Sequence, residues 1–156
     1  MTIRRLADEI EYSQPVVYSH FANRAAIVAA VAIEGFGELA TEIRQALGQE
    51  VDARTALANA AEAYLAYAGA HPALYQAMFT MPTDLRFAEV DSRPELRAAF
   101  AALAAVVPSG TPDVPLATEA FWAALHGLAE LERSGRIRSG AREERLSLVI
   151  DWLIRE

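Results

Sequence analysis

One short stretch near the amino end, SQPVVYSHF (residues 13–21), gathers side chains that could recognise a nucleic acid. Gln14 can hydrogen-bond the edge of a base at two points, and Val16 can contact a thymine methyl group. Tyr18 and His20 can donate hydrogen bonds to phosphate oxygens. The same aromatic and histidine side chains could instead close a small core. Residue types alone therefore leave two interpretations open, nucleic-acid contact and packing.

Catalytic and metal-binding patterns are not found elsewhere. His20, His71 and His126 lie far apart, no two of them have the spacing of metal ligands, and the chain has no cysteine. No serine has a nucleophile motif around it, and there is no glycine-rich phosphate loop. His126 and Glu130 stand one helical turn apart, either as an acid–base pair or as an ordinary hydrogen-bonded histidine. We therefore expect no metal, no cofactor and no enzymatic activity.

Composition bounds the class of protein. A chain of 156 residues that is 53% hydrophobic and 22% charged can bury a core and is not of the disordered type. It shows neither a signal peptide nor an apolar run of the roughly 20 residues that a membrane span needs, and with no cysteine we expect a cytoplasmic protein. The net charge of −7 argues mildly against a nucleic-acid partner, although residues 1–27 hold three arginines and three acidic residues and are neutral.

Apolar spacing near 3.6 residues and the absence of strand-like runs predict an all-α chain. Proline, glycine and capping residues divide it into expected helices at 2–10, 13–21, 24–47, 52–70, 73–80, 93–107, 116–133 and 142–155, with a loop at 108–115. Gly35 and Gly37 interrupt the long helix, either for close packing or as a soft point in it. Two domains are expected, 1–44 and 45–156, with the long helix 24–47 connecting them.

The first two helices have the layout of a helix-turn-helix, because about two to four residues join them and the second begins Ser-Gln-Pro. Ala7 supplies the small residue where the second helix crosses the first. Leu6, Val17 and Phe21 would form the contacts between the helices. Gln14, Val16, Tyr18 and His20 would then point outward.

The segment TIRRLADEIEYSQPVVYSHFANRAAIVAAV (2–31) resembles the DNA-binding segment of the TetR family of bacterial regulators, whose Tyr-x-His-Phe motif is specific. The resemblance implies an all-α homodimer that binds a double-stranded DNA operator. It further implies that the protein represses transcription and that a small apolar effector releases it from the operator. It also implies these DNA-binding residues: Thr2, Arg4, Ser13, Gln14, Pro15, Val16, Tyr18, His20 and Arg24.

Two features depart from the family pattern. Glu11 occupies the turn where the family usually has glycine, and the family places a further helix before position 2. Either the start is set too late or the chain lacks that helix. If the helix is missing, Ile3, Leu6 and Phe21 lose a packing partner, and we expect this chain to bind DNA weakly and added upstream residues to restore binding. The alternative is a helical protein that binds small molecules or dimerises and has lost DNA binding.

The remainder of the chain resembles the family more loosely. Trp122, His126 and Gly127 in TEAFWAALHGLAELERSGRI (118–137) are similar to a subgroup with a Trp…His-Gly signature. Large aromatic and methionine side chains gather in the middle of this body, either to fill a core or to line a pocket for a small apolar effector. The expected pocket residues are Tyr64, Tyr67, His71, Met78, Phe79, Phe100, Trp122 and His126.

The last two expected helices carry more apolar surface than one core face needs, and the final helix is apolar nearly all round. In the family the last two helices of each subunit form a four-helix dimer interface, and packing within one chain is the alternative. The expected interface residues are Phe121, Leu125, Leu128, Val149, Trp152 and Leu153.

Overall fold

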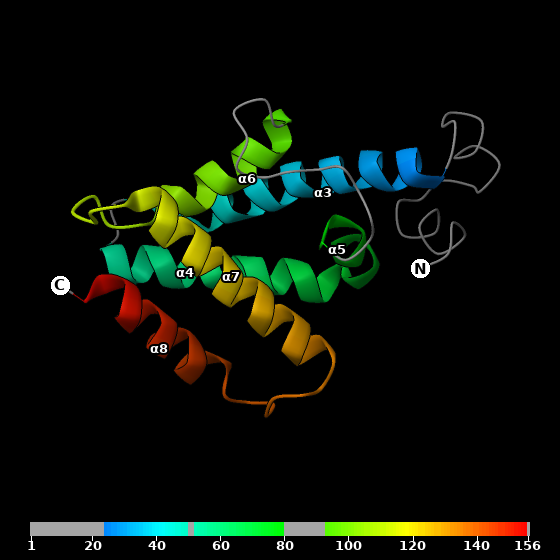
Figure 1. The fold of residues 1–156 in the computed structure, drawn as a ribbon. Helices are drawn as coiled ribbons and strands as arrows, with labels where there is room; N and C mark the ends of the chain where they lie inside the picture. Colours follow the sequence, from blue (N-terminus) through cyan, green and yellow to red (C-terminus); the bar gives the residue numbers. More distant parts are fainter. Residues whose placement is uncertain (1–23, 50–51, 80–92, 156) are drawn as a thin grey trace.

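The computed structural model describes residues 24–49, 52–79 and 93–155, and within these ranges it contains helices and no strand. The prediction of an all-α chain is confirmed. The helices, labelled as in Figure 1, are α3 (Arg24–Ala46), α4 (Ala53–Ala70), α5 (Pro72–Phe79), α6 (Pro94–Ala104), α7 (Val114–Arg133) and α8 (Arg142–Ile154). The expected helices at 2–10 and 13–21 lie outside the described residues.

Helix boundaries follow capping chemistry. Asp52 caps α4 by accepting hydrogen bonds from the Thr55 backbone N–H at 3.0 Å and from the Thr55 hydroxyl at 2.7 Å. His71 ends α4, and Pro72 begins α5 where its missing N–H costs nothing. These boundaries agree with the sequence to within about one residue.

Two boundaries differ from the expectation. α7 begins at Val114, inside the expected loop 108–115, because Asp113 accepts a hydrogen bond from the Leu116 backbone N–H at 3.0 Å and Pro115 fits the first turn. α6 ends at Ala104, three residues early, although Val106 and Val107 beyond it are still buried. Apolar periodicity marks burial, and here the burial continues into turns that are not helical.

The long helix α3 is embedded in the body, between α6 on one side and α4 and α5 on the other (Figure 1). Its buried residues are Ile27, Val28, Val31, Ala32, Gly35, Phe36, Leu39, Ala40 and Ile43. A Cβ atom at Gly35 would lie 2.7 Å from the Met78 sulfur, so glycine lets α5 approach closely. At Gly37 a Cβ would lie 3.5 Å from Glu95, an ordinary contact, so packing does not require glycine there.

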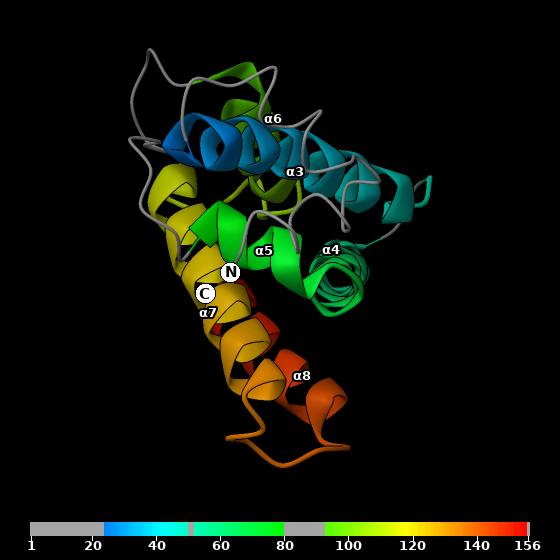
Figure 2. The same cartoon turned by 90° about the vertical axis from the view of Figure 1, so that its right-hand side faces the viewer.

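α7 and α8 pack on the opposite side of α4 and extend together away from α3, as the turned view in Figure 2 shows. Arg142 and Arg145 of α8 both donate hydrogen bonds to the Glu132 carboxylate of α7. Burial alone would raise the pKa of Glu132, but these two guanidinium groups outweigh it and hold that pKa below its ordinary value. The pair of helices is therefore joined by ionic contacts at one end.

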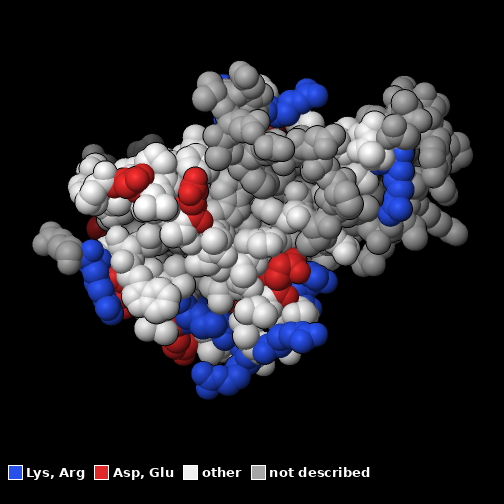
Figure 3. Space-filling view, viewed as in Figure 1, with Lys and Arg blue, Asp and Glu red and all other residues white. Residues whose placement is uncertain are grey.

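Charge is unevenly distributed over the surface. Figure 3 shows basic side chains gathered over the turn between α7 and α8, where Arg133, Arg136 and Arg138 are exposed. Among the described helices, none is both long and apolar enough to cross a membrane.

Candidate functional site

Aromatic rings from five helices meet in the middle of the body. This aromatic cluster consists of Phe36 of α3, Tyr64 of α4, Tyr75 and Phe79 of α5, Phe100 of α6, and Trp122 and His126 of α7. The Phe79 ring lies 4.7 Å from that of His126 and 5.2 Å from that of Phe36, and Trp122 lies 6.3 Å from Phe100. Such spacings are typical of edge and tilted aromatic pairs, which favour a defined arrangement over simple burial.

A chain of hydrogen bonds, here called the polar relay, runs through this cluster. The Trp122 indole N–H donates to the Tyr64 hydroxyl at 3.0 Å, the hydroxyls of Tyr64 and Tyr75 lie 2.6 Å apart, and the Tyr75 hydroxyl lies 2.7 Å from Nδ1 of His126. Tyr64 and Tyr75 are 0% and 1% exposed. The relay thus gives two fully buried phenols a partner on each side.

Which group donates each hydrogen bond of the relay follows from the two end groups, Trp122 and His126. Trp122 can only donate, so the Tyr64 oxygen accepts from it. If His126 is neutral with its proton on Nε2, Nδ1 accepts from Tyr75, and Tyr75 accepts from Tyr64. Every proton then has an acceptor. If Nδ1 is protonated, Tyr75 must turn its proton to Tyr64, and the Tyr64 proton loses its acceptor in the relay. The geometry therefore favours the neutral imidazole.

The pKa values agree with that protonation state. Burial lowers the pKa of His126 below its ordinary value of 6.5, while the nearby Glu130 carboxylate acts in the opposite direction. Burial also raises the pKa of both Tyr64 and Tyr75, the effect at Tyr75 being increased by Tyr64 and Glu130. The relay is neutral near pH 7.

Stability is expected to fall as the pH falls below 6.5, the value of His126 in the unfolded chain. Below that pH the unfolded chain binds a proton that the folded chain accepts only at its own, lower pKa, so protons favour unfolding. Urea unfolding at a series of pH values checks this. The pKa of Glu132 is also lowered in the folded chain, so its protonation reduces stability only as the pH falls below 4.5, its ordinary pKa. The pH ranges in which His126 and Glu132 reduce stability are therefore separate.

The control for this pH dependence is the variant His71→Gln, which leaves the relay intact and should keep the loss of stability below pH 6.5. An NMR titration of the His126 ring assigns the group directly. A His126 pKa at or above 6.5 in the folded chain would contradict the directed relay.

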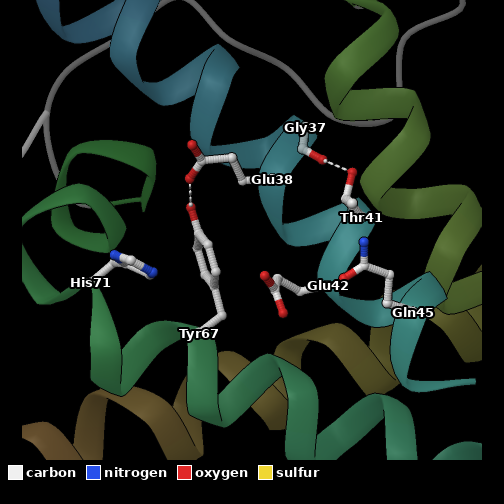
Figure 4. Close-up of a pocket in the computed structure, with 7 residues that line it drawn as sticks. All are labelled: Gly37, Glu38, Thr41, Glu42, Gln45, Tyr67 and His71. Carbon is white, nitrogen blue, oxygen red and sulfur yellow. Dashed lines mark hydrogen bonds between the residues drawn. The ribbon is translucent and has the colours of Figure 1, made fainter.

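A surface hollow of about 500 Å³ lies between α3 and the carboxyl end of α4 (Figure 4). It is lined by Gly37, Glu38, Thr41, Glu42, Gln45, Tyr67 and His71. The Tyr67 hydroxyl donates toward the Gly35 carbonyl oxygen and Oε2 of Glu38, each at 3.1 Å. The hollow shares no residue with the aromatic cluster.

The eight expected pocket residues therefore fall into separate places. Tyr64, Phe79, Phe100, Trp122 and His126 belong to the aromatic cluster. Met78 is buried against α3 at Gly35, whereas Tyr67 and His71 line the surface hollow.

Two members of the cluster were not among those eight, and different signals could have found them. Tyr75 stood in the same run of large side chains as Phe79, but nothing in the sequence placed it opposite Tyr64. Phe36 lies on the buried stripe of α3, which predicts burial without naming what it contacts. The spacing of four residues between Glu38 and Glu42 could have indicated that the two carboxylates of the hollow share one face of a helix.

The expected interface residues also differ in exposure. Phe121 and Leu125 are 1% and 0% exposed and belong to the core of the single chain, so they face away from any partner. Leu128, Val149 and Leu153 are partly buried against that core. Trp152 is 66% exposed, and three further large apolar side chains are exposed on α7 and α8: Leu116, Leu131 and Leu148.

Of the expected DNA-binding residues, Arg24 is described. It is exposed at the first position of α3. Thr2, Arg4, Ser13, Gln14, Pro15, Val16, Tyr18 and His20 lie outside the described residues. In the described part of the chain, no group of three or more histidine, aspartate or glutamate side chains could hold a metal ion.

Solved structures with the same fold are known. A protein of unknown function from Rhodococcus sp. RHA1 is 24% identical with a TM-score of 0.69, over 98% of this chain and 82% of that one. SCO4313, a regulatory protein by its description, is 20% identical with a TM-score of 0.66, over 98% and 84%. A TetR-family regulatory protein from Rhodococcus RHA1 is 18% identical with a TM-score of 0.64, over 98% and 86%.

One family model identifies the family of the chain. No curated protein matches the chain. The model described as tetracyclin repressor-like, C-terminal domain, matches residues 57–155, which is more than half of the 156 residues. These residues include α7 with its Trp122, His126 and Gly127 and most of α4, so the match covers every member of the aromatic cluster except Phe36, and also the exposed face of α8. The chain belongs to the TetR family of regulatory proteins.

Proposed function

We propose that this chain is a transcriptional repressor that binds a double-stranded DNA operator as a homodimer and is released by a small, largely apolar effector. Residues 1–44 carry the DNA-binding segment and the connector, and residues 45–156 bind the effector and dimerise. The observation that carries the proposal is the position of α3. It begins at Arg24, directly after the segment whose sequence predicts a helix-turn-helix, and is buried against α4, α5 and α6.

The aromatic cluster offers a route from effector to connector. Phe36 of α3 lies 5.2 Å from Phe79 and 6.2 Å from Trp122, ring centroid to ring centroid. An apolar molecule that separates these rings would displace Phe36, and α3 with it, and so change the position of the DNA-binding segment. Such coupling needs a difference in effector affinity between the two states of about 1–3 kcal/mol.

The outer faces of α7 and α8 suit a second copy of the chain. Leu148 and Trp152 stand one turn apart on α8 and are 54% and 66% exposed. Gly127 lies inside α7, where glycine costs about 1 kcal/mol relative to alanine, yet a Cβ there would meet no other part of the described residues within 4 Å beyond its own helix backbone. Close approach of a partner helix explains a glycine that packing within one chain does not require. A dimer also matches the two half-sites of an operator.

A pair of substitutions tests DNA binding. With operator fragments selected from random DNA by the purified chain, Gln14→Ala should cost about 1–3 kcal/mol and relax specificity at the bases it contacts. Arg24→Ala should instead weaken binding to all sequences equally and reduce the slope of log affinity against log salt by about one, because one phosphate contact is lost. Fluorescence anisotropy across a salt series measures both.

Family membership favours this regulatory role over a catalytic one. A protein that only binds small molecules would bind a ligand and show no salt-dependent DNA affinity. Binding of selected DNA that is indifferent to Gln14→Ala and Arg24→Ala alike would contradict the proposed interface.

A further inference from the structure

The surface hollow between α3 and α4 has the chemistry of a ligand site that the proposed effector does not use. Its volume of about 500 Å³ falls in the range of small-molecule sites. Figure 4 shows side chains entering it from both helices, with Tyr67 and His71 on α4 facing the acidic side of α3. An apolar effector would be poorly matched to it, since α3 contributes four polar side chains to the lining and the remaining two side chains, Tyr67 and His71, are aromatic but also polar.

The hollow is negatively charged. Glu38 and Glu42 stand one helical turn apart in its lining, and no arginine lines it. Neither carboxylate forms an ion pair with a described residue. Burial raises the pKa of the Tyr67 hydroxyl, and the charges of Glu38, Glu42 and Glu34 raise it further. The Arg44 guanidinium contacts the lining at the Thr41 hydroxyl, at 3.4 Å. A cation would be attracted and an anion repelled.

The residues that line the hollow suit an organic cation better than a metal ion. The rings of Tyr67 and His71 lie 4.9 Å apart and form one wall, and an aromatic face attracts an ammonium group. A bare metal ion would want a compact set of ligands, and the described residues hold no group of three or more suitable side chains. Thr41 and Gln45 add neutral hydrogen-bonding groups beside the carboxylates.

We propose that this hollow binds a small organic amine, its ammonium group held by Glu38 and Glu42 and its carbon chain lying against Tyr67 and His71. The ligand contacts the connector helix through the carboxylates and α4 through the rings. Binding therefore fixes α3 on α4 at a point separate from the aromatic cluster, and the protein has a second, polar ligand site.

Isothermal titration of the full chain with 1,4-diaminobutane at low ionic strength tests this. The diamine should bind, and Glu42→Gln should weaken its affinity about tenfold, because a charge-assisted hydrogen bond is lost. Glu42 is exposed, so the variant keeps its fold. Glu144→Gln is the control: it removes the same charge from an exposed position of α8, outside the hollow and not among the charges that act on Tyr67, and should leave the affinity within about twofold.

Each other outcome overturns the proposal. Equal weakening by Glu144→Gln and Glu42→Gln would mean general attraction by an acidic protein. Binding of butane-1,4-diol as tight as that of the diamine would exclude recognition of the ammonium group. Displacement of the diamine by an equal concentration of Mg²⁺ would assign the carboxylates to inorganic cations, and no heat with the wild-type chain would exclude the site. None of these measurements involves DNA, so the result is independent of the proposed operator binding.

Discussion

Trp152→Ala should weaken self-association of the chain about thirtyfold or more, because a buried tryptophan at the centre of an interface contributes 2 kcal/mol or more to binding. The side chain is 66% exposed in the single chain, so its removal should change the stability of the monomer by no more than about 0.5 kcal/mol. Sedimentation equilibrium over a range of concentrations measures the dissociation constant, and urea unfolding of the dilute protein measures the stability.

Two further variants make this result specific to the face of α7 and α8. Trp152→Phe keeps a large ring and should retain most of the affinity. Gly127→Leu places a bulky side chain at the surface of α7 and should disrupt the dimer without disturbing the monomer, because among the described residues nothing beyond the helix's own backbone lies within 4 Å of an added Cβ. A dimer that tolerates both Trp152→Ala and Gly127→Leu would have to use another surface.

The sequence predicted the helices well because local chemistry sets their ends. Asp52, Pro72 and the two glycines of positive φ, Gly135 and Gly140, each act within a few residues of their own position. Such signals can be detected without knowing the tertiary structure. Periodicity also identified the buried stripe of α3, which needs only that one face of a helix be apolar.

For the candidate site, the sequence predicted the types of side chain but not which of them contact one another. Aromatic residues in α4, α5 and α7 indicated a cluster, but Tyr64 and Tyr75 become partners through the way α5 packs across α3 and α4. Tyr67 follows Tyr64 by three residues, about 60° short of a full turn, and its hydroxyl donates to Gly35 and Glu38 of α3 beside the hollow instead. Phe121 and Leu125 are buried within the single chain. The sequence could not distinguish them from interface residues, because an apolar helical face can be covered either by its own chain or by a partner.

Tyr75→Phe should lower the free energy of unfolding by about 2–4 kcal/mol, although it removes a single oxygen atom. That oxygen joins the Tyr64 hydroxyl at 2.6 Å to Nδ1 of His126 at 2.7 Å, so two hydrogen bonds are lost together. The Tyr64 hydroxyl is then left with a proton and no acceptor in a fully buried site. Urea unfolding at pH 7 and one fixed protein concentration measures the effect, since dimerisation would otherwise change the apparent stability.

Tyr67→Phe is the matched control for the relay. It also removes a buried phenol hydroxyl with two acceptors, Gly35 and Glu38, but Glu38 is exposed and its carboxylate regains water, so the loss should be about 1 kcal/mol. The difference between the two variants isolates the cost of leaving Tyr64 without an acceptor. Equal losses would mean that a water molecule replaces the Tyr75 hydroxyl. The cluster would then have room for a polar guest between Tyr64 and His126, and an effector could enter there without separating the rings around Phe36.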